Sequence, residues 1–322
     1  MIFTQLPQPF ASVHRPLTYV FSQIAASELH LRVLDVRSGA LLGSKRFHAV
    51  GQAAADVAPI VRRALRFRPT AGATGVVRGE DRTVCVQLAG EGTFSPVRSF
   101  TAAAGVPLPP ALLTTMPSRR IMAYGESDEI TCCIPERHTV TITGDGAAAP
   151  LEFRMPADER ELTLIRVDTR DFAPETRSIS VVVATDGAVV GRIDYTLVAS
   201  FGAGSVRMAW RSSAGSIEHY TFPVVAGIAR RTERTTWRTD RGETVASVRS
   251  ERLVTLRSAF ETAAVAEALS EIAAAPQVWR VASDGYEPVE LLAAEEPQAL
   301  SRHGALCCVE IVLRDPSRIL VS

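Results

Sequence analysis

Alternation of apolar and polar residues is the main pattern along this chain, and it predicts β-strands. In residues 29–35 (LHLRVLD), apolar side chains occupy every second position over most of the segment. Successive side chains of a strand point to opposite faces, so this pattern predicts one buried and one solvent-facing side. Segments rich in β-branched residues follow at 160–168, 177–185 and 189–198, and we expect strands there too.

Turn residues between these segments predict hairpins. Residues 37–39 (RSG) separate the strands expected at 29–35 and 40–47, and 186–187 (DG) stand just before the strand expected at 189–198. A further hairpin is expected around 212–216. The Arg-, Thr-, Ser- and Glu-rich segment 229–257 keeps alternating apolar positions and predicts exposed strands.

Two segments have the periodicity of short amphipathic helices. The first is expected over 58–67, with Pro59 in the first turn, where a missing N–H costs nothing. The second is expected over 259–274, where Ser258 and Glu261 have the spacing of a capping box.

Many short strands and two helices predict a mainly β fold. We expect multi-domain β-sandwich-like modules with a few short helices as α+β elements, because too few helices intervene to connect a parallel sheet. The expected division is an N-terminal β-rich domain with a short helix (1–98), a linker and middle β segment (99–155), and a C-terminal β-rich domain with one helix (156–322). The Pro-rich stretch 99–118 is expected to be irregular.

Composition and charge narrow the function classes. The 322 residues are 46% hydrophobic and 22% charged, which is typical of a globular chain with a core. Thirty-five basic and 35 acidic residues cancel, which argues against a nucleic-acid partner. Prolines interrupt the longest uncharged run, 99–118, so no membrane segment is expected. The N-terminus lacks the pattern of a signal peptide, and we expect synthesis in a reducing cytosol.

The five cysteines include two vicinal pairs, 132–133 and 307–308, with Cys85 alone. His138 and His303 lie near these pairs, which raises a thiol nucleophile or a metal site as alternatives. Adjacent cysteines do not have zinc-ligand spacing, and free cysteine behaves as a small apolar residue. We therefore expect reduced, mostly buried thiols, with the two members of each pair on opposite sheet faces, and no metal or other cofactor.

No familiar catalytic motif occurs in the sequence. Glu126, Asp128 and Glu129 are closely spaced on an expected loop, but neighbouring acids alone do not place two carboxylates across a cleft. A solvated loop is the favoured interpretation, and we expect that the protein is not an enzyme. A hydrolase using His and Cys or paired acids stays as an alternative that requires a pocket with convergent polar groups.

The Arg-rich segment 230–241 (RRTERTTWRTDR) is the strongest candidate for an interaction surface. Glu233 and Asp240 dilute its charge, so a protein interface or a solvated strand face is favoured over a nucleic-acid site. Tryptophan and arginine are the residue types that dominate interface energetics. The candidate interface residues are Trp237, Arg231, Arg234, Arg238 and Arg241.

The order of several segments resembles structural proteins of tailed bacteriophages and prophages of Bacteroidetes-type hosts. The matching segments are RPLTYVFS (15–22), LHLRVLDVRSGALLGSKRF (29–47), DVAPIVRRAL (56–65), LLTTMPSRRIMAYGESDEI (112–130), SSAGSIEHYTF (212–222) and AEALSEIAAAPQVWRVASDGYEPVELL (266–292). The sequence departs from that pattern in detail, since HYTF replaces a tryptophan-richer version and LLTT replaces LTN.

This resemblance implies a virion structural protein of the tail-tip or baseplate type, assembled in the host cytoplasm. Its partners would be other virion and tail proteins and further copies of itself, and the family offers no catalytic residues to carry over. The alternative is a carbohydrate- or receptor-binding β-sandwich module. Exposure of Trp210, Tyr220, Trp237 and Trp279 on one sheet face would favour that alternative, and burial of all four would favour the virion protein.

Overall fold

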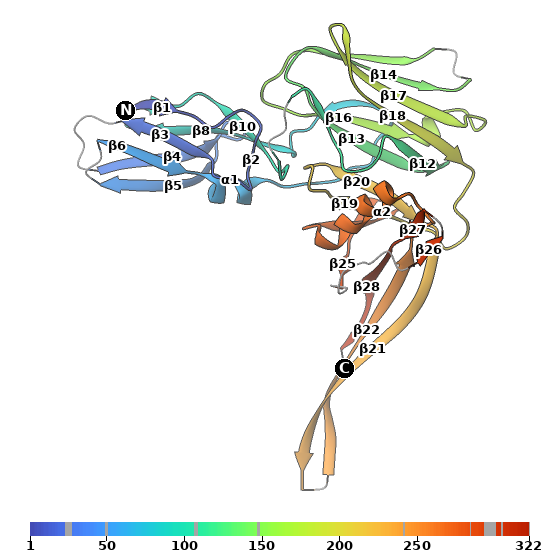
Figure 1. The fold of residues 1–322 in the computed structure, drawn as a ribbon. Coiled ribbons are helices and arrows are strands. Elements are labelled where there is room, and N and C mark those ends of the chain that lie inside the picture. Colours follow the sequence, from blue (N-terminus) through green and yellow to red (C-terminus); the bar gives the residue numbers. More distant parts are fainter. Residues whose placement is uncertain are drawn as a thin grey trace. The chain divides into compact units, whose positions relative to one another are not determined.

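The computed structural model describes residues 1–22, 28–48, 51–105, 109–146, 149–240, 242–283, 285–292, 301–303 and 305–321. By its internal contacts the chain divides into two units (Figure 1). Unit 1 contains Met1–Leu197 with Ser212–Ile217, and unit 2 contains Val198–Arg211 with Glu218–Ser322.

Unit 1 begins with two sheets that enclose one apolar core. The first sheet has the order β1 (Ile2–Gln5), β3 (Thr18–Ser22), β6 (Gln52–Asp56). The second has the order β2 (Ala11–Ser12), β10 (Arg98–Thr101), β8 (Thr83–Gly90), β4 (Glu28–Asp35), β5 (Leu41–His48), with β9 (Thr93–Phe94) beside β8. Tyr19 and Phe21 from the first sheet pack with Leu31, Val86 and Phe100 from the second, and α1 (Ala58–Ala64) adds Val61 to this core.

Two further sheets of unit 1 form a second sandwich. One has the order β11 (Ala111–Leu113), β13 (Ser127–Cys133), β16 (Thr163–Asp168), β7 (Gly75–Arg78). The other has the order β12 (Arg119–Ala123), β18 (Ala188–Val198), β17 (Ser178–Thr185), β14 (His138–Gly144), β15 (Leu151–Met155). Ile130 and Ile165 face Val140, Val181 and Tyr195 in the core between them. A short 3-10 turn, η1 (Thr169–Asp171), follows β16.

Unit 2 contains three sheets and the second α-helix. The first sheet has the order β20 (Ile217–Phe222), β19 (Val206–Arg211), β23 (Val278–Ala282), β24 (Gly285–Pro288). The second has the order β21 (Val224–Thr239), β22 (Gly242–Arg257), β28 (Glu310–Val321), β25 (Glu290–Leu291), and β26 (Ser301–His303) pairs with β27 (Leu306–Cys308). Helix α2 (Ala263–Ser270) continues into the 3-10 turn η2 (Glu271–Ala274).

The predicted fold class is confirmed: the chain consists of β-sandwich-like modules with few helices. The hairpin turn at 37–39 is present, and Gly39 adopts a φ of +68° that favours glycine. The turn at 186–187 joins β17 to β18 in the same way, with Gly187 at +93°.

Both helices form, but with different ends from those predicted. Helix α1 stops at Ala64 because Leu65 is already extended, three residues before the expected end. Helix α2 begins after Thr262, so the capping box predicted at Ser258 and Glu261 is wrong. The Ser258 hydroxyl instead accepts a hydrogen bond from the Val309 N–H at 2.9 Å, and Glu261 forms a β-bridge with Cys307.

The expected irregular stretch 99–118 is also corrected in part. Its first residues belong to β10, which lies between β2 and β8, and Ser99, Phe100 and Thr101 are buried. Residues 111–113 form β11. Proline content did not reveal these strands because their buried, paired positions depend on partners distant in the sequence. Residues 106–108 lie outside the described part of the chain.

Candidate interaction surface

The hairpin of β21 and β22 is the longest pair of strands in the described structure. The two strands pair antiparallel from Val224↔Arg257 to Thr239↔Gly242. Strand β28 pairs with β22 only as far as Arg249, so residues 234–239 and 242–248 form a two-stranded ribbon (Figure 1). This confirms the prediction of exposed strands over 229–257, and we call residues 234–248 the ribbon end.

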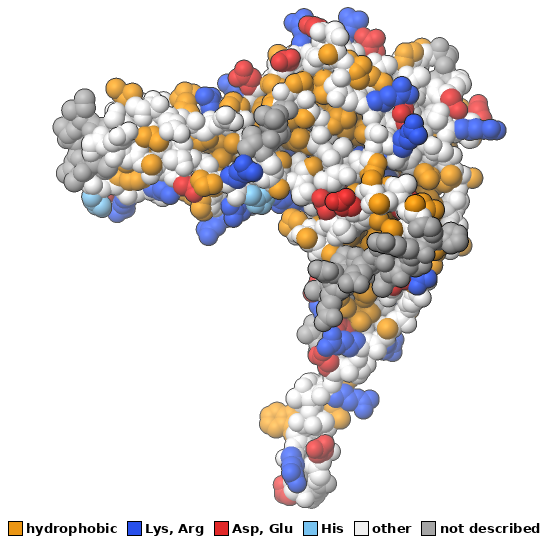
Figure 2. Space-filling view, viewed as in Figure 1, with side chains coloured by type: hydrophobic (Ala, Val, Ile, Leu, Met, Phe, Trp, Pro, Cys, Tyr) orange, Lys and Arg blue, Asp and Glu red, His pale blue; other side chains and the backbone are white. Residues whose placement is uncertain are grey.

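Side chains of the ribbon alternate between its two faces, and the faces differ in chemistry. Trp237 lies on one face opposite Thr244, and Arg234 and Arg238 lie on the other, opposite Val248 and Glu243. Both faces of the ribbon end are open to solvent, and Figure 2 shows hydrophobic side chains standing out from it.

Trp237 is the most exposed of the large hydrophobic side chains in the described part of the chain, at 67%. Val245 on the same ribbon end is 48% exposed, and Ile228 nearer its base is 59% exposed. Val245 pairs with Thr236, so it lies on the ribbon face opposite Trp237, and the ribbon end carries an exposed apolar side chain on each face.

The predicted interface arginines have different surroundings. Arg231 forms an exposed ion pair with Glu233 at 3.1 Å, so its charge is compensated locally. Arg234 and Arg238 are exposed and make no ion pair or hydrogen bond within the part of the chain that the structure describes. Arg241 lies outside the described residues. The structure therefore places two uncommitted guanidinium groups close to Trp237 along the chain.

The base of the ribbon is fixed by ion pairs. The guanidinium of Arg314 on β28 contacts Glu251 at 2.6 Å and Glu290 at 2.6 Å, and Arg252 contacts Asp315 at 3.6 Å. Glu251 and Asp315 are buried, so these pairs are partly shielded from water. These ion pairs connect β22, β25 and β28 at the base from which the ribbon end extends.

The other aromatic residues singled out in the sequence are not exposed. Trp210 is fully buried and Trp279 is 7% exposed. Tyr220 is half-buried, and its hydroxyl donates to Glu261 at 2.8 Å and accepts from the Ala259 N–H. Burial is the main cause that raises the pKa of this hydroxyl, and the nearby carboxylate of Glu261 raises it further. Of these four aromatic residues only Trp237 is exposed, so the four side chains neither lie exposed on one sheet face nor are all buried.

The cysteines pack as apolar side chains, as predicted. All five thiols are free and buried. Cys132 faces the core of the second sandwich, whereas Cys133 packs with Phe10, Leu113 and Leu162 on the other side of β13. Burial raises the pKa of both thiols, that of Cys133 to about 12, and so disfavours the thiolate.

Both ring nitrogens of His138 lie within hydrogen-bond distance of other protein groups. Its Nδ1 lies 2.9 Å from the Glu136 carbonyl and its Nε2 lies 3.2 Å from Thr163 Oγ1. No group of three or more metal-ligating side chains is gathered within the described residues. In the second His and Cys group, Cys307 and Cys308 are buried, and the side chain of His303 lies outside the described part of the chain.

Of the three acidic residues predicted to lie on a solvated loop, Asp128 and Glu129 are instead on strand β13, so that prediction is wrong for these two; Glu126 precedes the strand. Asp128 and Glu129 are 4% and 5% exposed. Asp128 accepts hydrogen bonds from Arg120 at 2.8 Å and Tyr195 at 2.9 Å, and Glu129 accepts one from Arg82 at 2.7 Å. Arg82 and Tyr195 lie 47 and 67 residues from their partners, and Arg120, although near in sequence, lies on β12 of the facing sheet, so the local pattern did not reveal these contacts.

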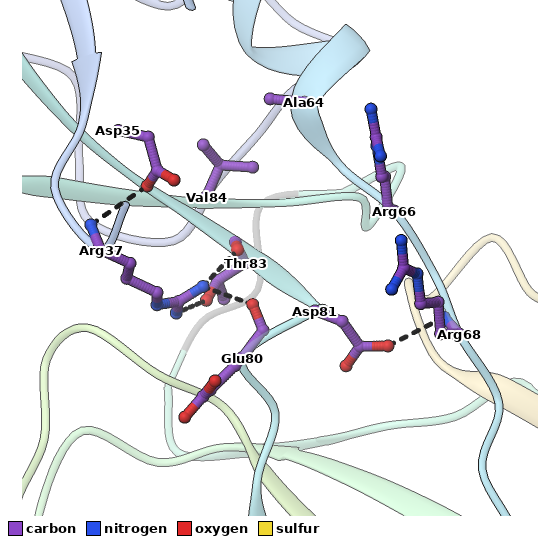
Figure 3. A pocket seen from close by; sticks show the side chains of 9 residues that line it. All are labelled: Asp35, Arg37, Ala64, Arg66, Arg68, Glu80, Asp81, Thr83 and Val84. Atoms are coloured by element: carbon purple, nitrogen blue, oxygen red, sulfur yellow. Dashed lines mark hydrogen bonds between the residues drawn. The ribbon is translucent and has the colours of Figure 1, made fainter. Parts of the chain in front are cut away.

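A polar cavity of about 290 Å³ lies beside the β4–β5 and β7–β8 turns (Figure 3). Arg37 reaches into it and donates to the carbonyl and hydroxyl of Thr83 and to the carbonyl of Glu80. Asp35 accepts from the Arg37 N–H and Asp81 from the Arg68 N–H at 2.9 Å. These charged groups hold the surrounding turns in place.

Comparison with known proteins identifies no sequence relative. No protein-family model matches the chain, and no curated protein matches it. In addition, the described residues contain no helix with the length and hydropathy needed to cross a membrane.

Similarity to solved structures is low. The BSP domain of a biofilm-associated protein is 15% identical with a TM-score of 0.19, over 61% of this chain and 30% of that one. DIP-gamma IG1+IG2 is 12% identical with a TM-score of 0.19, over 61% of this chain and 95% of that one. The chicken CNTN1 FN1-FN3 domains are 12% identical with a TM-score of 0.17, over 60% of this chain and 64% of that one. The chain thus spans less than a third of the biofilm-associated protein, and the β-sandwich assignment rests on the strand pairing and cores described above.

Proposed function

We propose that this chain is a non-enzymatic assembly protein that acts through protein contacts made by the β21–β22 hairpin. The observation that carries the proposal is the ribbon end with Trp237 at 67% exposure. An isolated two-stranded hairpin is at best marginally stable in water, and a partner that covers one face or edge would stabilise it. Tryptophan flanked by arginines has the residue types that contribute most to protein interfaces.

The finer proposal is a virion structural protein of a tailed phage or prophage, at the tail tip or baseplate. The resemblance in the order of sequence segments supports it, and a chain of β-sandwich modules with a projecting hairpin is compatible with it. In this proposal the partners are other tail proteins and further copies of the chain, with no nucleic acid, membrane or cofactor involved.

Incorporation into phage particles tests this proposal. Trp237→Ala should fold normally by circular dichroism yet reduce the amount of chain in particles from the source strain at least tenfold. Val189→Ala is the matched control, because Val189 is 66% exposed on another hairpin and its loss should change nothing. Absence of the wild-type chain from particles would refute the virion role, and normal incorporation of Trp237→Ala would remove the ribbon from the interface.

A receptor- or carbohydrate-binding module is the second candidate, because Trp237 is an exposed aromatic side chain that could stack on a sugar. A glycan array with the wild-type chain and Trp237→Ala separates the two candidates. Binding to a defined glycan that disappears in the variant would favour the module, and assembly without glycan binding would favour the structural role.

A further inference from the structure

The charge of unit 2 is divided between two consecutive segments. Residues 224–257, which contain the hairpin, carry eight arginines and four acidic residues and have a net charge of +4. Residues 258–292 carry six acidic residues and one arginine and have a net charge of −5. The chain as a whole is neutral, so each copy presents a basic hairpin and an acidic segment of opposite charge.

The acidic segment also contains a cavity of about 380 Å³. It is lined by Ala275 and Pro276 after η2, by Trp279 on β23, and by Pro288, Glu290 and Leu291 near β24 and β25. This volume lies within the range of pockets that enclose a small ligand, and it is large enough for an indole ring. Trp279 and the two prolines give it apolar walls, and the side chain of Glu290 is 62% exposed at its edge. We call this cavity the socket.

The ribbon end and the socket have complementary properties. Trp237 is a large apolar side chain without cover, and the socket is a cavity with apolar and polar walls that no described residue fills. Arg234 and Arg238 are uncommitted cations on the ribbon face opposite Trp237, and the carboxylate of Glu290 lies exposed at the edge of the socket. Glu290 keeps Arg314 as a partner on one side, and its exposed side chain can accept further hydrogen bonds.

We propose that the ribbon end of one copy docks on a second copy of this chain, with Trp237 seated in the socket of that copy. This proposal rests on the assembly function above and names its partner. The donor and acceptor surfaces differ, so repetition of the contact produces a closed ring of two or more copies or an open filament. Opposite charges speed the encounter and select the orientation, and the buried tryptophan supplies most of the affinity.

Sedimentation velocity of the purified chain tests the proposal. The wild-type chain should form dimers or larger species as concentration rises. Trp237→Ala should weaken this association by about 30-fold or more, as expected for an interface hot spot, and Val189→Ala should leave it unchanged. Ala275→Phe, which fills the socket from its half-buried wall, should weaken the association to a similar degree. Ala273→Trp blocks the same cavity from an exposed position and replaces Ala275→Phe if that variant misfolds by circular dichroism.

A mixing experiment gives the most direct readout. Trp237→Ala retains a socket and Ala275→Phe retains a ribbon end, so an equimolar mixture should form a dimer and nothing larger. Normal assembly of the socket variants would overturn the proposal, because contact between two ribbons does not need the socket. A mixture that stays monomeric would overturn it as well.

The same variants separate this proposal from the assembly function. If the wild-type chain is monomeric at all concentrations but Trp237→Ala is lost from particles, the ribbon binds a different protein: the assembly function stands and the second-copy proposal fails. If Trp237→Ala both self-associates and enters particles like the wild type, both proposals fail.

Discussion

Arg82 and Glu129 form a buried ion pair, in which Arg82 Nη2 donates to Glu129 Oε1 at 2.7 Å. Arg82 is 1% exposed and Glu129 is 5% exposed. The guanidinium also lies 4.9 Å from the centre of the Phe67 ring, while Arg166 approaches the other oxygen of Glu129 at 3.8 Å. Arg82 precedes β8 of the first sandwich and Glu129 lies on β13 of the second, so this pair connects the two modules of unit 1.

Removal of Arg82 should therefore destabilise unit 1 strongly. Arg82→Met leaves Glu129 buried with only the longer contact to Arg166, and we expect a loss of about 3–5 kcal/mol in the free energy of unfolding. Arg82→Met with Glu129→Leu should recover most of this loss, because both fully buried charges are removed and the groups that lose a partner, Asp81 and Arg166, are partly exposed. Urea denaturation measures both. Arg192→Ala, which breaks an exposed pair with Asp194, is the control and should cost less than about 1 kcal/mol.

The buried thiol of Cys133 predicts a loss of stability at alkaline pH. Burial raises its pKa from 9.0 to about 12, so the folded chain keeps a proton that the unfolded chain releases. The stabilisation is fully present below pH 9 and is lost as the pH rises from 9 towards 12, with a slope of up to about 1.4 kcal/mol per pH unit. Cys133→Ala should reduce this slope in denaturation curves between pH 8 and 11, and the raised pKa of Cys132 should keep part of it. An identical slope in the variant would show that this thiol does not titrate with unfolding.

Gly215 should tolerate a side chain less well than Gly187. Both have a positive φ, at +80° and +93°, so alanine is strained at either position by about 1–2 kcal/mol. A Cβ on Gly215 would also lie 2.7 Å from the backbone nitrogen of Ala103, whereas one on Gly187 meets open space. Gly215→Ala should therefore cost roughly 1–3 kcal/mol more than Gly187→Ala in thermal or urea unfolding. Equal costs would contradict the close approach of the 212–216 turn to residue 103.

Ser258 should stabilise the fold through its hydrogen bond with the Val309 N–H and not by capping helix α2. Ser258→Ala removes the acceptor of the buried Val309 N–H, and we expect a loss of about 1–3 kcal/mol with unchanged helix content by circular dichroism. Thr262→Ala removes the observed N-cap and should cost about 1 kcal/mol or less. Reduced helix content in Ser258→Ala would instead show that Ser258 caps the helix, as the sequence predicted.

Local patterns predicted the features that local chemistry determines. Alternation predicted the strand at 29–35, observed as Glu28–Asp35, and the RSG turn predicted its hairpin because glycine adopts the required φ at little cost. The opposite directions of Cys132 and Cys133 followed from strand geometry alone.

Features set by distant partners could not be predicted in this way. The three acids at 126–129 look like a solvated loop in the sequence, and only the fold brings Arg82 and Arg120 to Glu129 and Asp128. The exposure of Trp237 is a similar case. The alternation over 229–257 indicated the strands, but the register of β28 against β22 is set between residues more than 50 positions apart.

The early end of the β22–β28 pairing has a mechanical consequence. Beyond Arg249 the hairpin continues for six or seven residues per strand, and at about 3.3 Å per residue the ribbon end has a reach of roughly 20 Å. A contact made by Trp237 is therefore made near the end of a two-stranded ribbon, away from the sheet at its base. Twisting or bending of these two strands can compensate for a misalignment between subunits that a flat interface would not tolerate. Subunits connected through the ribbon end would be held apart by its length and could change their relative angle while the contact made by Trp237 is kept.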